Sequence, residues 1–301
     1  MLPNFLIIGA QKAATSWLAQ CLGEHPDVFM AEQKEIHFFN HYFDRGLVWY
    51  ESHFSEWTGQ TTVGEATPGY LSHPDAPGRI KATLGGGVKL IASLRHPVDR
   101  AYSAYWHHVR LGKIPVNADF HTALEQDDQV GLRSRGDYFT HLSRYLEYFQ
   151  REDLLILIYE EIKGDPQKAV SGCLEFLGTD SQFVPDTLNS RVNKGTDIRL
   201  FHSWAVKLRR SVAATRYLLP RGFREPFRAV GSRAFEHLVL KRLPEQKRRI
   251  PLDEDLRQEL LGGFMPGIVK LEELLNVDLS IWYAPSRAPS EDQILHVTRS
   301  V

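Results

Sequence analysis

The chain has 301 residues, of which 43% are hydrophobic, and its 36 Lys and Arg nearly balance its 37 Asp and Glu. A chain of this length can bury a large core, and the balanced charge argues against nucleic acid as a partner. No stretch approaches the roughly 20 apolar residues that cross a bilayer. Met1 leads into the first expected strand without a signal-peptide pattern, so we expect a cytoplasmic protein.

The two cysteines, Cys21 and Cys173, lie in two separate predicted helices. Two isolated cysteines indicate neither a disulfide framework nor a metal-ligand cluster. We therefore expect no metal site.

Residues 3–18 predict a buried strand, a turn and a helix. Residues 5–8 are apolar without polar alternation, which is typical of a central parallel strand covered on both faces. Gly9 and the small residues within 13–16 permit a tight turn, and the hydroxyls of that segment favour a helix start. A helix N-terminus beside an ammonium group, here that of Lys12, is a site for an anion.

The position of Lys12 narrows the kind of anion. The common triphosphate-binding loop reads G-x-x-x-x-G-K-[ST], whereas Lys12 follows Gly9 by three residues and the second glycine is missing. An ordinary ATPase or GTPase is thus disfavoured. Taken alone, the stretch is also compatible with an unrelated strand-turn-helix unit.

The next segments are rich in aromatic residues. Residues 32–39 combine charges, a histidine and two phenylalanines, and residues 40–60 predict a helix and loop beside a pocket or in a peripheral aromatic core. Residues 62–71 predict a short strand that Pro68 and Gly69 interrupt.

Alternating strands and helices follow, which indicates a parallel, doubly wound sheet with its site at the carboxyl ends of the strands. We expect strands over 88–97 and 154–159, and helices over 97–111, 120–126, 138–149 and 165–177. The last of these carries an Asp-Pro start and a glycine stop.

The remainder is expected to be mainly helical, with a final helix over 253–275 that packs on the core. The segment from Arg199 to Arg249 holds fourteen Lys and Arg and three Asp and Glu. It is interpreted either as a solvated helical face or as a surface for an anionic acceptor or a membrane. We expect one domain, with a core over about 3–200 and a helical, basic part over about 200–285.

Two further segments complete a candidate site. Arg95 ends the strand over 88–97, and Ser103 lies two turns into the next helix. An arginine fork pairs two phosphate oxygens, and a hydroxyl serves a third. Residues 191–196 form a basic, glycine-containing loop that suits a phosphate but is also an ordinary surface turn. Each motif alone is compatible with a structural role.

In this order, the three motifs resemble those of the sulfotransferases that use 3′-phosphoadenosine 5′-phosphosulfate (PAPS), over about residues 3–200. The resemblance implies a P-loop-like α/β fold, PAPS as co-substrate, 3′-phosphoadenosine 5′-phosphate (PAP) as product and no metal. The donor-binding residues it implies are Gln11, Lys12, Ala13, Ala14, Thr15, Ser16, Arg95, Ser103, Arg191, Lys194, Gly195 and Thr196.

Residues 34–39 are similar to the Lys-Glu-Pro-His-Phe-Phe segment of the heparan-sulfate-type and related bacterial enzymes, with Ile36 in place of the proline. The resemblance implies that Glu35 is the catalytic base, with Lys12 at the leaving oxygen and His37 as a neighbour that orients or replaces Glu35. Those enzymes carry a lysine where this chain has Ala66. Glu65 and the two histidines His107 and His108 are rival candidates for the base.

We therefore predict a sulfotransferase acting on a hydroxyl or amine acceptor. A P-loop small-molecule kinase is one alternative; it requires a magnesium-binding carboxylate at a strand end. A non-catalytic module that binds phosphoadenosine nucleotides is the other. The acceptor, whether a small molecule, a glycan or a lipid, and the oligomeric state are not fixed by the sequence.

Overall fold

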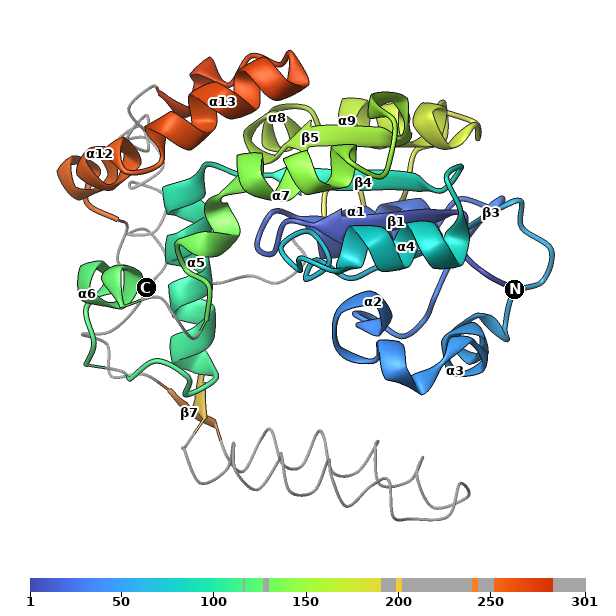
Figure 1. The fold of residues 1–301 in the computed structure, drawn as a ribbon, viewed down its shortest axis with the longest axis horizontal. Helices are drawn as coiled ribbons and strands as arrows, with labels where there is room; N and C mark the ends of the chain where they lie inside the picture. Colours follow the sequence, from blue (N-terminus) through green and yellow to red (C-terminus); the bar gives the residue numbers. More distant parts are fainter. Residues whose placement is uncertain (116, 127–129, 191–198, 202–239, 243–251, 284–301) are drawn as a thin grey trace, which may run out of the picture.

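A five-stranded parallel sheet forms the centre of the molecule in the computed structural model (Figure 1). The structure describes residues 1–115, 117–126, 130–190, 199–201, 240–242 and 252–283. The strand order is β2-β3-β1-β4-β5, and each neighbouring pair is parallel. The strands are β1 (Phe5–Gly9), β2 (Val28–Met30), β3 (Thr62–Ala66), β4 (Lys89–Leu94) and β5 (Leu154–Ile158). The predicted doubly wound α/β fold is confirmed.

Strand β1 is buried on both faces, as its sequence predicts. Phe5 and Ile7 belong to one apolar core, and Leu6 and Ile8 belong to the other. The first core is closed by α1 (Thr15–Gly23), α8 (Tyr159–Gly164) and α9 (Pro166–Leu177). The second is closed mainly by α4 (Ala76–Leu84), α5 (Pro97–Arg110) and α7 (Tyr138–Leu146).

Short elements surround this core. Helices α2 (Phe38–His41) and α3 (Leu47–Glu51) lie near the β3 side of the sheet, and α6 (Phe120–Glu125) lies beside α5 (Figure 1). Strand β6 (Arg199–Phe201) pairs antiparallel with β7 (Leu240–Arg242). The 3-10 turns are η1 (Phe43–Arg45), η2 (Ser52–Phe54), η3 (Ser134–Gly136), η4 (Arg151–Asp153) and η8 (Ser280–Trp282).

The predicted single helix over 253–275 is wrong in one respect, because it is two helices. Helix α12 (Glu254–Gly262) ends at a pair of glycines, and α13 (Met265–Leu275) begins with Pro266 in its first turn. Glycine has the highest backbone entropy to lose in a helix, and proline is tolerated only in a first turn, so the break falls between them. Helix α13 packs against α7 (Figure 1).

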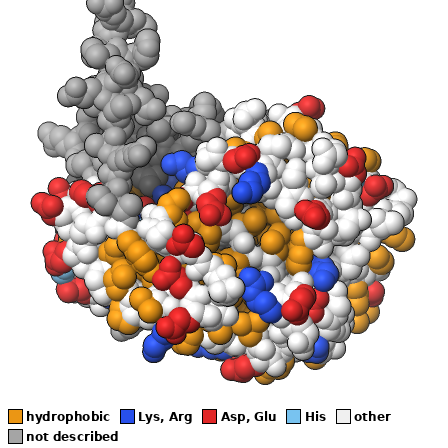
Figure 2. All heavy atoms as spheres, turned by 90° about the horizontal axis from the view of Figure 1, so that it is seen from above, with side chains coloured by type: hydrophobic (Ala, Val, Ile, Leu, Met, Phe, Trp, Pro, Cys, Tyr) orange, Lys and Arg blue, Asp and Glu red, His pale blue; other side chains and the backbone are white. Residues whose placement is uncertain are grey.

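Two predicted segments lie wholly or largely outside the described residues. They are the loop over 191–196 and the basic segment over 199–249, of which only β6 and β7 are described. In the described part of the chain, no helix is long and apolar enough to cross a membrane. Figure 2 shows acidic and basic side chains interspersed with apolar ones over one face of the molecule.

The carboxyl ends of the parallel strands meet at one edge of the sheet. The turn after β1 carries Lys12, the segment after β2 carries Glu35, and Arg95 directly follows β4. β1 is the strand at which the order of the sheet reverses, and such switch points form crevices in open α/β sheets. The topology therefore collects the sequence-predicted residues at one edge.

Candidate active site

The turn after β1 is tight for two different reasons. Lys12 and Ala14 adopt left-handed backbone conformations, with φ of 74° and 66°. Gly9 is needed for space, because a Cβ on it would lie 2.6 Å from the Cβ of Leu71. The tight turn predicted from the small residues is confirmed.

Helix α1 begins at Thr15, as its sequence predicts, but it has no side-chain cap. Ala14 is the N-cap and provides no side-chain cap, whereas Thr15 and Ser16 are the first residues of the helix itself. The hydroxyls therefore lie in the first turn, where the backbone N–H groups have no intrahelical acceptor. Such a helix end suits an anion, because its N–H groups and the helix dipole both favour negative charge.

The turn is fixed to the neighbouring strand β4 by hydrogen bonds. The Ser93 hydroxyl donates to the carbonyl oxygen of Ala13 at 2.6 Å, and the Ala10 N–H donates to the Ser93 carbonyl at 2.6 Å. Arg135 donates from Nη1 to Oε1 of Gln11 at 2.9 Å. Sequence reasoning missed both partners. Ser93 had a signal, as a hydroxyl inside an apolar strand, whereas Arg135 had none.

Arg95 lies between the turn and the end of β4. Its Nη1 donates to the carbonyl oxygen of Lys12 at 3.1 Å, and its guanidinium carbon is 4.6 Å from the centre of the Tyr159 ring. The Tyr138 hydroxyl donates to the Arg95 carbonyl at 2.8 Å. Among the described residues, the buried Nε of Arg95 has no hydrogen-bond partner. A buried guanidinium N–H without an acceptor fits a phosphate oxygen, since buried donors normally have partners.

Ser103 lies two turns into α5 and is 9% exposed. The structure thus agrees with the predicted strand-end arginine and helical serine. The remaining predicted donor residues, Arg191, Lys194, Gly195 and Thr196, lie outside the described residues.

Glu35 and His37 lie in an unusual turn after β2. Both have positive φ, 57° and 60°, which is uncommon for residues other than glycine. Oε2 of Glu35 is 3.4 Å from Nε2 of His37, and Nδ1 of His37 is 3.3 Å from Oδ1 of Asn40. The hydrogen bond from His37 holds the pKa of Glu35 below its ordinary value, against the opposing effect of burial. Glu35 is therefore ionised at neutral pH, as a base must be.

Glu65, one of the rival bases, is placed where an acceptor does not reach it. It is 1% exposed, and both of its carboxyl oxygens accept hydrogen bonds from buried hydroxyls. Burial raises the pKa of Glu65 despite these bonds. This arrangement is that of a structural carboxylate.

The two histidines at 107 and 108 differ from each other in burial. His108 is 3% exposed, and burial lowers its pKa to about 3. His107 is half-buried; burial and the charge of Lys12 lower its pKa to about 4, while Glu35 opposes this shift. Since His107 feels both groups, it stays a rival base, whereas His108 is part of the core.

The kinase alternative expects a magnesium-binding carboxylate at a strand end, and Glu160 after β5 is the candidate. Its Oε1 accepts from the His96 N–H at 3.1 Å, and its Oε2 accepts from Nε1 of Trp282 at 2.9 Å. Both carboxyl oxygens of Glu160 therefore already accept hydrogen bonds from protein groups. Within the described ranges, no group of three His, Cys, Asp or Glu side chains is arranged to hold a metal ion.

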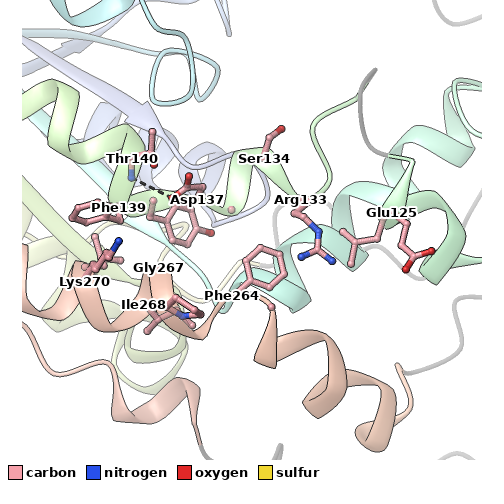
Figure 3. Close-up of a pocket in the computed structure, with 16 residues that line it drawn as sticks. Glu125, Arg133, Ser134, Asp137, Phe139, Thr140, Phe264, Gly267, Ile268 and Lys270 are labelled. Atoms are coloured by element: carbon pink, nitrogen blue, oxygen red, sulfur yellow. Dashed lines mark hydrogen bonds between the residues drawn. The ribbon is translucent and has the colours of Figure 1, made fainter.

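A cavity of about 580 Å³ lies elsewhere, between the start of α7 and the α12–α13 junction (Figure 3). The Arg133 guanidinium lies 5.4 Å from the Phe264 ring, and the Lys270 ammonium lies 5.6 Å from the Phe139 ring. Tyr138 lines this cavity and also binds the backbone of Arg95. The cavity therefore adjoins the donor site behind Tyr138 and contains none of the predicted site residues.

Comparison with known proteins gives a consistent picture. Residues 2–196 match the model of the sulfotransferase domain family. The membrane-associated sulfotransferase kil1 of Dictyostelium discoideum is 36% identical over 162 residues, which cover 51% of this chain and 33% of that protein. The human heparan sulfate glucosamine 3-O-sulfotransferase 3B1 is 34% identical over 195 residues, which cover 60% of this chain and 49% of that protein. The matches thus span a third to a half of these curated relatives.

Among solved structures, a sulfotransferase from Alicyclobacillus acidocaldarius has a TM-score of 0.69 and 28% sequence identity. The alignment covers 94% of this chain and 100% of that one. The likeness therefore extends over the whole architecture, beyond the region that the family model covers.

Proposed function

The chain belongs to the sulfotransferase family, and from this membership we propose that it transfers a sulfuryl group from PAPS to a hydroxyl or amine acceptor. The observation that carries the donor assignment is the contact between Arg95 and the Lys12 carbonyl. This contact joins Arg95, the proposed ligand of a 3′-phosphate, to the turn of Lys12, which is proposed to bind a 5′-phosphosulfate. A nucleotide that carries both groups therefore suits the site.

In this proposal, residues 11–16 bind the 5′-phosphosulfate through backbone N–H groups, hydroxyls and the Lys12 ammonium. Arg95 and Ser103 bind the 3′-phosphate, together with the loop over 191–196. The proposal is supported by the uncapped start of α1 and by the buried Nε of Arg95, which lacks an acceptor among the described residues.

Sulfuryl transfer needs an acceptor atom in line with the sulfur. The ionised carboxylate of Glu35 takes the acceptor's proton as the acceptor forms its bond to sulfur. The bond between sulfur and the bridging oxygen breaks, and PAP leaves with that electron pair, its charge stabilised by Lys12. The proximity of His37 to Glu35 supports its role as the residue that orients the base.

A glycan hydroxyl is the acceptor that we favour, since the human relative is named as a heparan sulfate glucosamine sulfotransferase. Ala66 follows Glu65 in β3, where the resemblance leads us to expect a lysine in enzymes of that type. The acceptor contacts of this chain are therefore expected to differ there. The cytoplasmic location and a membrane contact through residues 199–249 stay predictions.

Incubation with ³⁵S-labelled PAPS and fractionated glycans tests the proposal, with PAP binding measured by calorimetry. We expect labelled product, PAP binding in preference to Mg-ATP, and loss of both binding and transfer in Lys12→Ala. Lys89→Ala is the matched control, because Lys89 begins β4 at the opposite edge of the sheet. Binding of PAP without transfer to any acceptor would favour the non-catalytic module, and preference for Mg-ATP would favour the kinase.

A further inference from the structure

Three backbone N–H groups of the turn that carries Glu35 and His37 donate hydrogen bonds to one neighbouring segment, residues 66–70. The Glu35 N–H donates to the Ala66 carbonyl at 3.2 Å. The His37 N–H donates to Oγ1 of Thr67 at 3.3 Å, and the Phe38 N–H donates to the Tyr70 hydroxyl at 3.0 Å. Residues with positive φ persist when their surroundings determine them, and these three contacts do so here.

Two of these acceptors are hydroxyls, and a hydroxyl accepts reliably only when its own proton is engaged elsewhere. Thr67 donates its proton to Oε2 of Glu65 at 2.6 Å, and Tyr70 donates to Oε1 at 2.6 Å. Glu65 accepts from both of these hydroxyls and from Tyr50, which is the arrangement of an ionised carboxyl group, and it thereby fixes the direction of both hydroxyls. The lone pairs of Thr67 and Tyr70 are left facing the N–H groups of His37 and Phe38.

From these contacts we propose that Glu65 is a positioning residue, which acts through Thr67 and Tyr70 to hold the turn bearing Glu35 and His37. Glu65 does not touch the reacting atoms; it sets the orientation of two hydroxyls, and they set the turn. The network is buried, since Glu65 and Tyr70 are 1% and 0% exposed and Thr67 is 0% exposed. In a buried network, each hydrogen bond is costly to leave unmade.

Tyr50 supplies a matched control. Its hydroxyl also donates to Oε1 of Glu65, at 3.0 Å, and it is equally buried. No hydrogen bond joins the Tyr50 hydroxyl to the backbone of residues 35–38 in the described structure. Its ring stacks on Phe38 at 4.3 Å between centres, a contact that phenylalanine retains. Tyr50→Phe and Tyr70→Phe thus remove the same group from the same carboxylate oxygen, but only Tyr70→Phe removes an acceptor from the turn.

The first test is amide hydrogen exchange by NMR, which needs no turnover. In Tyr70→Phe we expect the Phe38 amide to exchange at least about tenfold faster, and in Thr67→Val we expect the same for the His37 amide. Tyr50→Phe should leave both amides within about twofold of wild type. Glu65→Gln should accelerate the His37 amide most, because the amide end of the glutamine forces one hydroxyl to reverse.

The second test rests on the proposed function and compares kcat with KM. Misplacement of a base lowers kcat, so we expect kcat for sulfuryl transfer to fall about tenfold or more in Tyr70→Phe, Thr67→Val and Glu65→Gln. KM for PAPS should stay within about twofold, because the donor turn is elsewhere. Tyr50→Phe should stay near wild type in both.

The two tests separate the two claims. Absence of transfer in the wild type overturns the proposed function, while the exchange experiment still decides the role of Glu65. Equal effects of Tyr50→Phe and Tyr70→Phe, or unchanged exchange at His37 and Phe38 in all four variants, overturn the positioning role. Thermal unfolding of each variant confirms that it is folded.

Discussion

At the scale of single residues, Arg95 connects several parts of the candidate donor site. It binds the Lys12 carbonyl, faces the Tyr159 ring and keeps Nε buried. We expect Arg95→Ala to weaken PAP binding by about 1.5–3 kcal/mol, the range for a hydrogen bond to a charged group, and to weaken adenosine 5′-phosphate binding much less. Calorimetry with both nucleotides measures the difference.

Arg151→Ala is the control for this substitution, because η4 precedes β5 at the amino edge of the sheet. An unchanged preference of Arg95→Ala for PAP over adenosine 5′-phosphate would contradict the 3′-phosphate role.

His37 is expected to set the lower limit of the pH range of the proposed reaction. Its hydrogen bond lowers the pKa of Glu35, so the base stays ionised to lower pH than an ordinary glutamate. In His37→Gln, we expect the pKa of Glu35 to rise, and the pH below which transfer is lost to move upward with it. The carboxyl ¹³C shift of Glu35, assigned with Glu35→Gln, and the pH dependence of kcat/KM both report this. A titration that moves downward would disprove the assignment.

The sequence predicted the residues of the candidate donor site well, and the residues that hold them in place poorly. Lys12 and Arg95 stand at strand ends, where spacing and polarity make them visible. Tyr138, which donates to the Arg95 carbonyl, and Arg135, which donates to Gln11, come from a segment with no sequence signal that points to the site. Glu65 was predicted only as a rival base, because burial is a property of the packed sheet and not of the local pattern.

At the scale of elements, α5 holds histidines in the neutral form. His108 is buried on its inner face, and neither ring nitrogen has a partner among the described residues. Its pKa is lowered by burial from 6.5 to about 3, so the unfolded chain binds the proton more readily than the folded one. The stability it contributes is therefore complete above pH 6.5 and is lost as the pH falls from there toward 3.

When the pH falls from 7.5 to 5.5, we expect the free energy of unfolding of the wild type to fall because His108 is protonated in the unfolded chain. In His108→Leu, this fall should be about 1 kcal/mol smaller. Urea unfolding at the two pH values measures this. His121→Leu, on the partly exposed surface of α6, is the control and should behave as wild type. Equal acid sensitivity of His108→Leu and wild type would show that folding does not lower the pKa of His108.

The elements themselves were predicted to within a few residues where capping signals are strong. Helix α9 begins at Pro166 after the Asp165 cap and ends before Gly178, as its sequence predicts. Helix α1 also begins at Thr15 as its sequence predicts, but its N-cap is Ala14, which provides no side-chain cap. Hydroxyls within 13–16 suggest an ordinary cap, but a site that binds an anion leaves its N–H groups uncapped.

At the scale of the whole molecule, Trp282 joins the C-terminal helices to the sheet. It is fully buried, and its Nε1 donates to Glu160, which also accepts from the N–H of His96 after β4. If residues 3–200 and the C-terminal helices form one domain, as the sequence predicts, then loss of this bond destabilises the entire fold.

We expect Trp282→Phe to lower the unfolding free energy by about 1–3 kcal/mol, since Oε2 of Glu160 loses its donor. Far-UV circular dichroism and tryptophan fluorescence should shift together in one transition. Separate transitions, with only one of them moved, would indicate two domains. Phe176 of α9, which is partly buried against the other apolar core, gives the control Phe176→Leu.

The parallel sheet was predictable, because four apolar or turn-bounded strands in alternation with helices leave few other topologies. The order β2-β3-β1-β4-β5 was not. It depends on which strands pair, and that is decided by side chains far apart in the sequence, such as the alternating faces of β1.

The three hydroxyls around Glu65 also constrain how this chain can diverge. A carboxylate that accepts three hydrogen bonds cannot be exchanged for an apolar residue while Tyr50, Thr67 and Tyr70 remain, because buried donors would lose their acceptor. Nor can Thr67 or Tyr70 be substituted alone while the turn over residues 35–38 keeps its shape. Among descendants of a common ancestor, we therefore expect these four positions to be inherited as a unit and to be replaced together.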